Sequence, residues 1–209
     1  MREWNLLRSY PQPESRKTGS RTIGDRILAS YRGRDFYDGP RSCGYGGYKY
    51  DERWAYVAED ISNDYQPIKR VLQLNCDKGY LVYELQKIGI NAFGIESSSY
   101  ARAHGIDGLL PGFNPDWVKN PFDLVIAIGF IYTMDLANAM LQIRELEKMS
   151  HKAFITLATY RTKEDYWLFK EWSLLGTLIL KREEWLEVLK HCGYTGDFWF
   201  VDAESLRLE

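Results

Sequence analysis

The chain has 209 residues, of which 45% are hydrophobic and 27% are charged, and its formal net charge is −2. These values are typical of one soluble globular domain with enough chain to bury a core. No apolar run is long enough to cross a bilayer, and the first residues lack the apolar centre of a secretory signal, so we expect a cytoplasmic protein with no membrane partner. Three scattered cysteines, Cys43, Cys76 and Cys192, argue against a disulfide framework and against a zinc site.

The N-terminal segment is basic. Residues 1–48 carry nine basic and five acidic side chains, so this segment has a charge of +4 and the remainder about −6. We predict an arm and lid rich in Tyr and Gly over 1–52, with a short helix at 23–31, followed by a domain at 53–209. Such an arm can bind nucleic acid, fold over the domain as a solvated segment, or hold a small anionic substrate. Because its arginines are isolated, nucleic acid is not expected, and we favour the anionic substrate.

Beyond the arm, helical and strand patterns alternate. The apolar spacing predicts helices at 53–65, 79–88, 97–104, 136–149 and 182–192, and strands at 71–74, 91–96, 122–130, 152–160 and 198–201. Strands that alternate with helices form a mainly parallel sheet covered on both faces. The sequence therefore predicts a doubly wound α/β fold.

The junction between the strand at 71–74 and the helix at 79–88 reads Asn75-Cys76-Asp77-Lys78-Gly79. In open α/β sheets, ligands bind at the carboxyl ends of the strands, so this turn is a candidate binding loop. Glu96 ends the next strand, where its two carboxylate oxygens match the two hydroxyls of a ribose. Asn and Asp tolerate the left-handed conformation that such a loop needs. We expect Lys78 to be solvated.

Several motifs together resemble one family. VLQLNCDKGYL resembles the V-L-D-x-G-C-G-x-G-x-L loop of class I S-adenosylmethionine-dependent methyltransferases, and AFGIESSSYA, FDLVIAIGFIYTM and EEWLEVLKHCGYTGDFWFV resemble later segments of that family. CGYGGYKYDERW and ATYRTKED resemble a bacterial subgroup that modifies small molecules or sugars. The resemblance implies S-adenosylmethionine as the cofactor. It also implies a seven-stranded Rossmann-like sheet whose last strand is antiparallel.

The loop departs from the family pattern. Gln73 replaces an acid, Asn75 and Asp77 replace the first two loop glycines, and Tyr132 stands where the subgroup tends to have histidine. The residues that the resemblance implies for cofactor binding are Gln73, Asn75, Cys76, Asp77, Gly79, Glu96, Ser97, Gly129, Tyr45 and either Asn114 or Asp116 for adenine. The candidates for catalysis are Tyr132, Tyr160 and Arg161.

Three functions are compatible with these residues. The first is methyl transfer to oxygen or nitrogen of a small, anionic acceptor. The second is a catalytically inactive relative that serves as a binding or scaffold partner, which the altered loop favours. The third, a nicotinamide enzyme, is disfavoured because a pyrophosphate needs bare glycines and Asp77 would repel it. Whether the chain forms a homodimer is left open.

Overall fold

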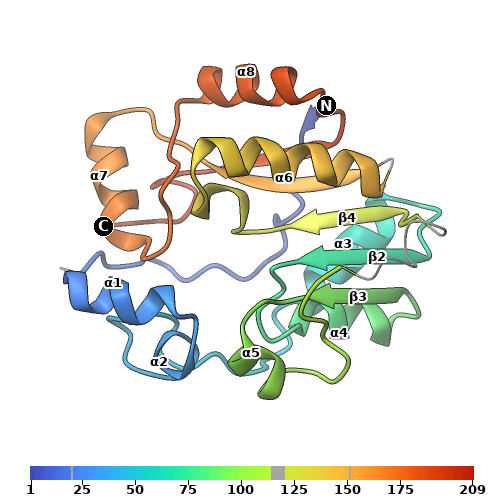
Figure 1. Ribbon diagram of the computed structural model, residues 1–209, viewed down its shortest axis with the longest axis horizontal. Helices are drawn as coiled ribbons and strands as arrows, with labels where there is room; N and C mark the ends of the chain where they lie inside the picture. The colour runs from blue at the N-terminus through green and yellow to red at the C-terminus, as the bar shows by residue number, and fades with distance from the viewer. Residues whose placement is uncertain (20, 114–120, 151) are drawn as a thin grey trace.

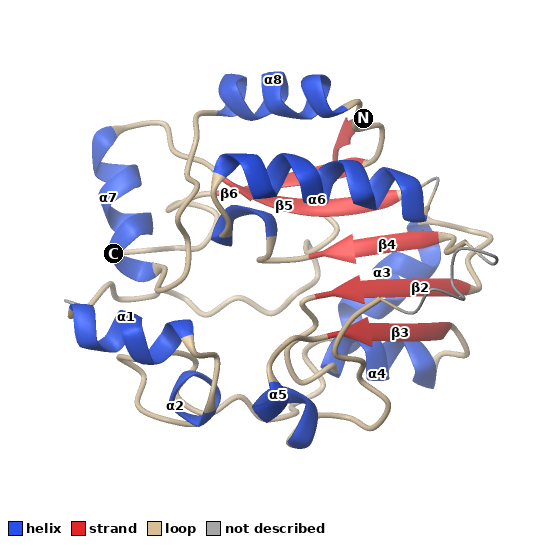
Figure 2. Ribbon diagram, in the orientation of Figure 1, coloured by secondary structure: helices blue, strands red, loops and turns tan. Residues whose placement is uncertain are grey.

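The computed structural model describes residues 1–19, 21–113, 121–150 and 152–209, and it contains an α/β fold around one sheet (Figure 2). The sheet has six strands among the described residues, in the order β1-β6-β5-β4-β2-β3. All neighbouring strands are parallel. The strands are β1 (Arg2–Glu3), β2 (Arg70–Leu74), β3 (Asn91–Ile95), β4 (Leu124–Ala127), β5 (Ala153–Ala158) and β6 (Asp197–Val201).

Helices cover both faces of this sheet. The described helices are α1 (Ile23–Ser30), α2 (Arg34–Tyr37), α3 (Ala55–Asp64), α4 (Tyr80–Lys87), α5 (Ser99–Ala103), α6 (Leu136–Met149), α7 (Lys163–Trp172) and α8 (Arg182–Cys192), with a 3-10 turn at Ile131–Thr133. Successive strand residues point to opposite faces. Leu124 and Ile126 of β4 therefore pack with α3 and α4, whereas Val125 packs with α6 and α8. The result is three layers with an apolar core on each side of the sheet.

Two sequence predictions about the sheet are wrong. The last strand, β6, runs parallel to β5 and pairs Phe198 with Ile155, so it is not antiparallel. A strand that follows a crossover helix in the same sheet returns in the parallel direction, and α8 is that helix. The strand expected at 122–130 covers only Leu124–Ala127. It ends early because the chain turns at Gly129, where φ is 65°, into the 3-10 turn.

The seventh strand of the resemblance is absent from the described part of the chain, which holds six. Three observed elements were not predicted, namely β1, α2 and α7. A signal for α7 was present in the sequence: the Thr162 side chain accepts a hydrogen bond from the Asp165 N–H, as expected of an N-cap three residues before an acid. None of the helices in the described ranges has the length and hydropathy that a membrane span needs.

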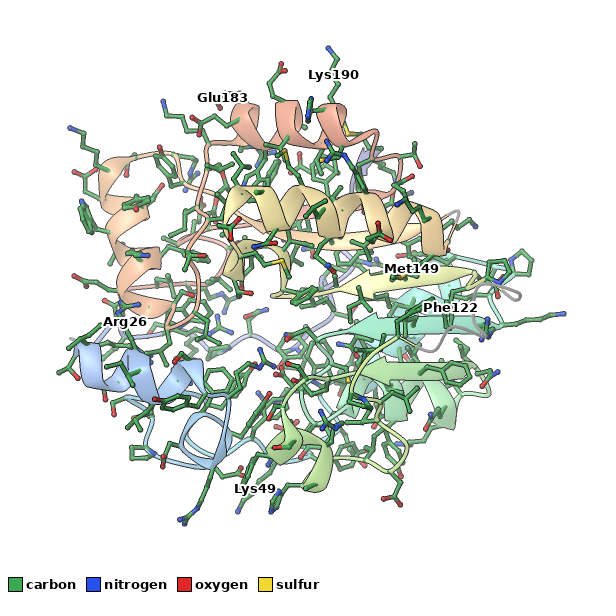
Figure 3. All side chains as sticks on the ribbon, in the orientation of Figure 1. Arg26, Lys49, Phe122, Met149, Glu183 and Lys190 are labelled. Carbon is green, nitrogen blue, oxygen red and sulfur yellow. The ribbon has the colours of Figure 1, made fainter. Side chains whose placement is uncertain are left out.

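The N-terminal arm lies across the carboxyl ends of the strands. In Figure 1 the arrowheads of β2, β3 and β4 point toward α1 and α2. One anchor is Arg26 of α1, which Figure 3 labels close to the end of α7. Its guanidinium donates to the carbonyl oxygens of Lys170 and Ser173, both at 2.9 Å. The arm is thus tied to the edge of the sheet at which ligands bind in folds of this class. The predicted boundary at residue 52 stays a prediction.

Candidate active site

The loop after β2 contains left-handed residues at two positions that are not glycine. Asn75 and Asp77 are both left-handed, each with a φ of 53°, and Gly79 follows with a φ of 79°. Any other residue at position 79 would be strained, because φ is positive there and a Cβ would lie 2.7 Å from the Ile106 side chain, which would have to shift. The prediction that Asn and Asp adopt the left-handed conformation is confirmed.

Two acids of the candidate site are bonded to the arm. The Arg32 guanidinium donates to Asp77 Oδ1 at 2.8 Å and to Glu96 Oε2 at 3.0 Å. Glu96 is fully buried. Its carboxylate also accepts the Asp77 N–H at 2.9 Å and the Ser98 N–H at 2.8 Å, while Ser97 Oγ lies 3.5 Å away. Every lone-pair position of the predicted ribose acid therefore already has a partner.

The Arg32 guanidinium and the Glu96 carboxyl both have shifted pKa values. Burial lowers the pKa of Arg32, but Asp77, Tyr37 and Glu96 outweigh burial and raise it above its ordinary value. Burial raises the pKa of Glu96 more than the Arg32 charge lowers it. Arg32 is therefore firmly cationic, and it sits in the left-handed region with a φ of 47°. An arginine held in this conformation requires support from its surroundings.

Tyrosines of the arm add further contacts between the arm and the loop after β2. The hydroxyls of Tyr37 and Tyr45 donate to the two oxygens of Asp77, at 3.0 and 2.9 Å. The rings of Tyr45 and Tyr48 stack with centroids 4.4 Å apart, and Tyr48 stacks in turn on Tyr80 at 5.1 Å. Tyr45, predicted from the sequence as a cofactor residue, therefore contacts the loop directly.

Lys78 is not solvated, so that prediction is wrong. It is 4% exposed, and its ammonium donates to both oxygens of Asp38 at 2.9 and 2.8 Å and to the Tyr48 carbonyl at 2.8 Å. The Tyr100 hydroxyl also donates to Asp38, at 2.9 Å. The arm provides the partners that Lys78 needs in order to be buried, and the sequence pattern of the loop alone cannot reveal them.

A cavity of about 1280 Å³ lies between the arm and the sheet. Of the predicted cofactor residues, those that line it are Gln73, Asn75, Cys76, Asp77, Gly129 and Tyr45. Tyr132, predicted as catalytic, also lines it. Glu96 is fully buried and is not part of the wall. The cavity therefore reaches the loop and the end of β4, but Arg32 separates it from the predicted ribose acid.

Three buried polar atoms of the wall have no hydrogen-bond partner among the described residues: Arg32 Nε, Gln73 Oε1 and Trp172 Nε1. A buried polar group without a partner is costly, so such atoms in a cavity indicate positions for ligand atoms. Gln73 Oε1 is an acceptor at the end of β2, where it suits an ammonium donor such as that of a methionine group. Trp172 Nε1 is a donor only.

Tyr132 keeps its proton at neutral pH and is a hydrogen-bond donor. Burial, followed by the charge of Asp77, raises its pKa to about 12. Its ring packs edge-on against Phe169, with centroids 5.8 Å apart. A hydroxyl that keeps its proton can orient a substrate oxygen or nitrogen through a hydrogen bond, whereas it is a poor general base.

The other predicted residues lie elsewhere. Tyr160 packs against Tyr166, and Arg161 is exposed and forms ion pairs with Glu204 and Asp165; neither Tyr160 nor Arg161 lines the cavity. Ser97 is exposed, and its carbonyl accepts from Arg102 at 2.7 Å. Asn114 and Asp116 lie outside the described residues. The structure thus brings Tyr132 to the loop and keeps Tyr160 and Arg161 away from it.

Sequence reasoning missed Arg32, Tyr37 and Trp172. The excess positive charge of the arm was a signal, but nothing local identifies which arginine meets Glu96, which lies 64 residues away. Among the described residues, no group of three or more His, Cys, Asp or Glu side chains is arranged to hold a metal ion. The three cysteines are buried and free.

Comparisons with known proteins give structural likenesses only. No family model matches the sequence. No curated protein matches it. Among solved structures, magnesium protoporphyrin IX methyltransferase (ChlM) from Synechocystis PCC 6803 with bound SAH is 18% identical, with 68% of this chain and 72% of that chain covered and a TM-score of 0.49. A SAM dependent methyltransferase from Archaeoglobus fulgidus is 14% identical, with 67% and 68% covered and a TM-score of 0.47.

The sugar N-methyltransferase KedS8 from Streptoalloteichus sp ATCC 53650 is 18% identical, with 46% of this chain covered and a TM-score of 0.38. This chain spans 42% of the length of that protein. At these identities and TM-scores, the likenesses carry no conclusion about what this chain binds or does. Its α/β architecture follows from its own parallel sheet and crossover helices.

Proposed function

We propose that the chain is an S-adenosylmethionine-dependent methyltransferase that methylates an oxygen or nitrogen of a small anionic acceptor. The observation that carries this proposal is the unpartnered Gln73 Oε1, which lies in the wall of a large cavity together with the left-handed loop residues Asn75 and Asp77. Carboxyl ends of parallel strands are the usual place for a ligand in this architecture. The resemblance of the loop to class I methyltransferases supports the same cofactor.

The residues present fit the methionine end of this cofactor. Gln73 Oε1 would accept from the ammonium group, and the backbone of 75–77 together with Gly129 would lie against the rest of that end. S-adenosylmethionine, when bound, supplies an electrophilic methyl group on its sulfonium sulfur. Tyr132 would orient the acceptor by donating a hydrogen bond, and the aromatic arm would exclude water from the cavity.

Binding of the ribose to Glu96 requires Arg32 to leave it, because all lone-pair positions of this carboxylate have partners. Only molecules in which Arg32 has left Glu96 could bind the ribose in this way. The apparent dissociation constant would therefore be the intrinsic one divided by the fraction of such molecules. Tyr45, which lines the cavity, would complete the proposed cofactor site together with Gly79 of the loop, whereas Ser97 is exposed and lies outside the wall. The described structure corresponds to a closed arm.

The test is calorimetric titration of the purified chain with S-adenosylhomocysteine, using Gln73→Leu as the variant. Because Gln73 Oε1 has no partner in the described part of the chain, leucine removes it without breaking a hydrogen bond seen there. We expect an unchanged melting temperature and about tenfold weaker binding, a loss of about 1.4 kcal/mol. Thr159→Val is the matched control, since Thr159 Oγ1 is also buried without a partner but lies outside the cavity wall. Absence of binding by the unmodified chain at millimolar ligand overturns the proposal.

One observation favours a second candidate, a non-catalytic binding or scaffold protein. Arg32 is paired with Glu96, the acid that the cofactor's ribose would need, and the Arg32 side chain is only 17% exposed. Under this alternative, Arg32 is a permanent part of the core. Arg32→Met separates the two candidates. Stronger binding of S-adenosylhomocysteine by this variant means that Arg32 competes with the ribose, as the methyltransferase proposal expects. No binding by either form, with the arm still protected from protease, favours the scaffold.

A further inference from the structure

The wall of the cavity carries an excess of positive charge. Seven of its residues are Lys or Arg and three are Asp or Glu, a difference of +4, although the whole chain is −2. The acids are largely committed, since Asp77 pairs with Arg32 and Asp51 pairs with Arg53. A concave surface with one sign of charge concentrates ions of the opposite sign. The remaining cations therefore decide what the cavity attracts.

Three arginines of the wall, Arg16, Arg21 and Arg41, form no ion pair with any carboxylate in the described part of the chain. Arg16 donates to the Leu206 carbonyl and the Gln12 amide oxygen. Arg21 and Arg41 donate through one nitrogen each to backbone carbonyls of the arm. These neutral partners leave the three positive charges uncompensated.

The arginines also act on one another. Burial lowers the pKa of Arg16, and the charges of Arg41, Arg207 and Arg53 lower it further against an opposing effect of Tyr10. Burial lowers the pKa of Arg21, followed by the charges of Arg41 and Arg26, while Asp25 acts in the opposite direction. Arg16 and Arg21 are half-buried and Arg41 is exposed, and repulsion among these cations is destabilising. An anion between them would relieve this repulsion.

A further donor lies in the same wall. Trp172 Nε1 is buried and has no hydrogen-bond partner in residues 1–19, 21–113, 121–150 and 152–209, and an indole can only donate. Guanidinium groups with several N–H donors and one unpartnered indole N–H together suit a ligand that is rich in acceptor oxygens. Arginine forks match carboxylate and phosphate oxygens in pairs.

We propose that Arg16, Arg21 and Arg41, with Trp172, form a binding site for a small polyanion that carries at least two carboxylate or phosphate groups. This inference rests on the proposed function, because the polyanion would be the acceptor of the methyl group. It narrows the acceptor from a small anion to a multiply charged one. It also places the acceptor against the arm, and the cofactor against the loop after β2.

Calorimetry on the full chain at low salt tests this site with pyrophosphate and citrate as the anions and glycerol as the neutral compound. We expect submillimolar binding of at least one anion and none of glycerol; the preferred anion then distinguishes phosphate from carboxylate recognition. Each single Arg→Gln substitution should weaken binding about tenfold, and the triple variant about 100-fold or more. Arg182→Gln is the matched control, since Arg182 is exposed and pairs with Glu3 away from the cavity.

Because these arginines also hold the arm, a triple Arg→Lys variant accompanies the triple Gln variant. Lysine keeps the charge and loses the fork, so it should retain part of the affinity while the Gln variant loses it. Two results would overturn the site. One is an unchanged anion affinity in the triple Gln variant. The other is no anion binding by the unmodified chain at about 10 mM anion, a concentration well above the dissociation constant expected of charge-assisted contacts.

A parallel titration with S-adenosylhomocysteine keeps the two proposals separable. If S-adenosylhomocysteine binds and neither anion does, the polyanion site is wrong and the cofactor proposal stands. If an anion binds through the three arginines and S-adenosylhomocysteine does not bind, the methyltransferase proposal is wrong and the chain is an anion-binding protein.

Discussion

The sheet and the arm are held together by different forces. The sheet buries alternate residues of β4 and β5 in two apolar layers, with Trp185 and Leu72 completely inaccessible to water. Residues 21–52 of the arm have a much smaller apolar cluster around Phe36 and Tyr37, and they are fastened mainly by charged and phenolic groups. Apolar burial is non-directional and additive, whereas an ion pair depends on both partners being in place. The sheet is therefore expected to be rigid and residues 21–52 of the arm to be releasable as a unit, whereas β1 and Leu6 stay with the sheet.

The largest expected effect breaks the sheet. Trp185→Ala removes a fully buried indole whose Nε1 donates to the Ala158 carbonyl at 2.7 Å. The free energy of unfolding should fall by about 3–5 kcal/mol because a large cavity remains. Chemical denaturation measures it. Trp167→Ala is the control, since Trp167 is 60% exposed, and it should change the free energy by less than about 0.5 kcal/mol. Equal effects of the two substitutions would mean that α8 does not stabilise the sheet.

A smaller effect should release the arm and leave the sheet folded. Lys78→Met removes the buried ammonium from Asp38 and the Tyr48 carbonyl. Breaking a buried pair from one side costs about 3–5 kcal/mol, and we expect about 2 kcal/mol because Asp38 can turn to water. Chymotrypsin should then cut faster after the aromatic residues of the arm.

Lys190→Met is the matched control for the arm, because Lys190 is exposed on α8 (Figure 3). It should leave the cleavage rate unchanged. If Lys78→Met also leaves the rate unchanged, the arm is fastened by its tyrosines and Arg32 rather than by this pair.

The smallest effect is a pH dependence at the start of α1. The Thr22 hydroxyl and N–H donate to Asp25, with smaller contributions from Ser42 and Cys43, and lower the pKa of Asp25 from 3.8 to about 2. A lowered folded-state pKa means that the stabilisation is complete above about pH 4 and is lost as the pH falls toward 2. Protease protection of the arm, measured with an acid protease, should decline in that window. Asp25→Asn should be less protected and show a flatter profile, and identical profiles would contradict this assignment.

Much of the fold was predictable from local patterns. The helix expected at 136–149 is observed as Leu136–Met149, and the strand expected at 152–160 is observed as Ala153–Ala158. The period of apolar residues is a local property, so each element can be recognised alone. The direction of β6 was not predictable from its own residues, because an apolar strand has the same pattern in either direction and the crossover decides it.

The candidate site was predictable only in part. Gln73 and Asp77 were expected from the resemblance of the loop, Tyr132 was expected from its place near a strand end, and all three line the cavity. Their partners were not identified. Tyr160 and Arg161 follow a strand in the same way, yet neither of them lines the cavity. A position after a strand indicates the correct edge of the sheet, but the side chain also has to point toward the ligand.

The sequence by itself determined the order of helices and strands, the left-handed loop and the basic character of the arm. These depend on residues that are neighbours in the chain, through side-chain periodicity, backbone sterics and composition. Only the tertiary structure decided that Arg32 reaches Glu96 and that Asp38 allows Lys78 to be buried. It also decided that three arginines of the cavity wall have no acidic partner within the described ranges. The physical reason is that an ion pair acts over a few ångströms, and the folded path of the chain alone determines which distant charges come that close.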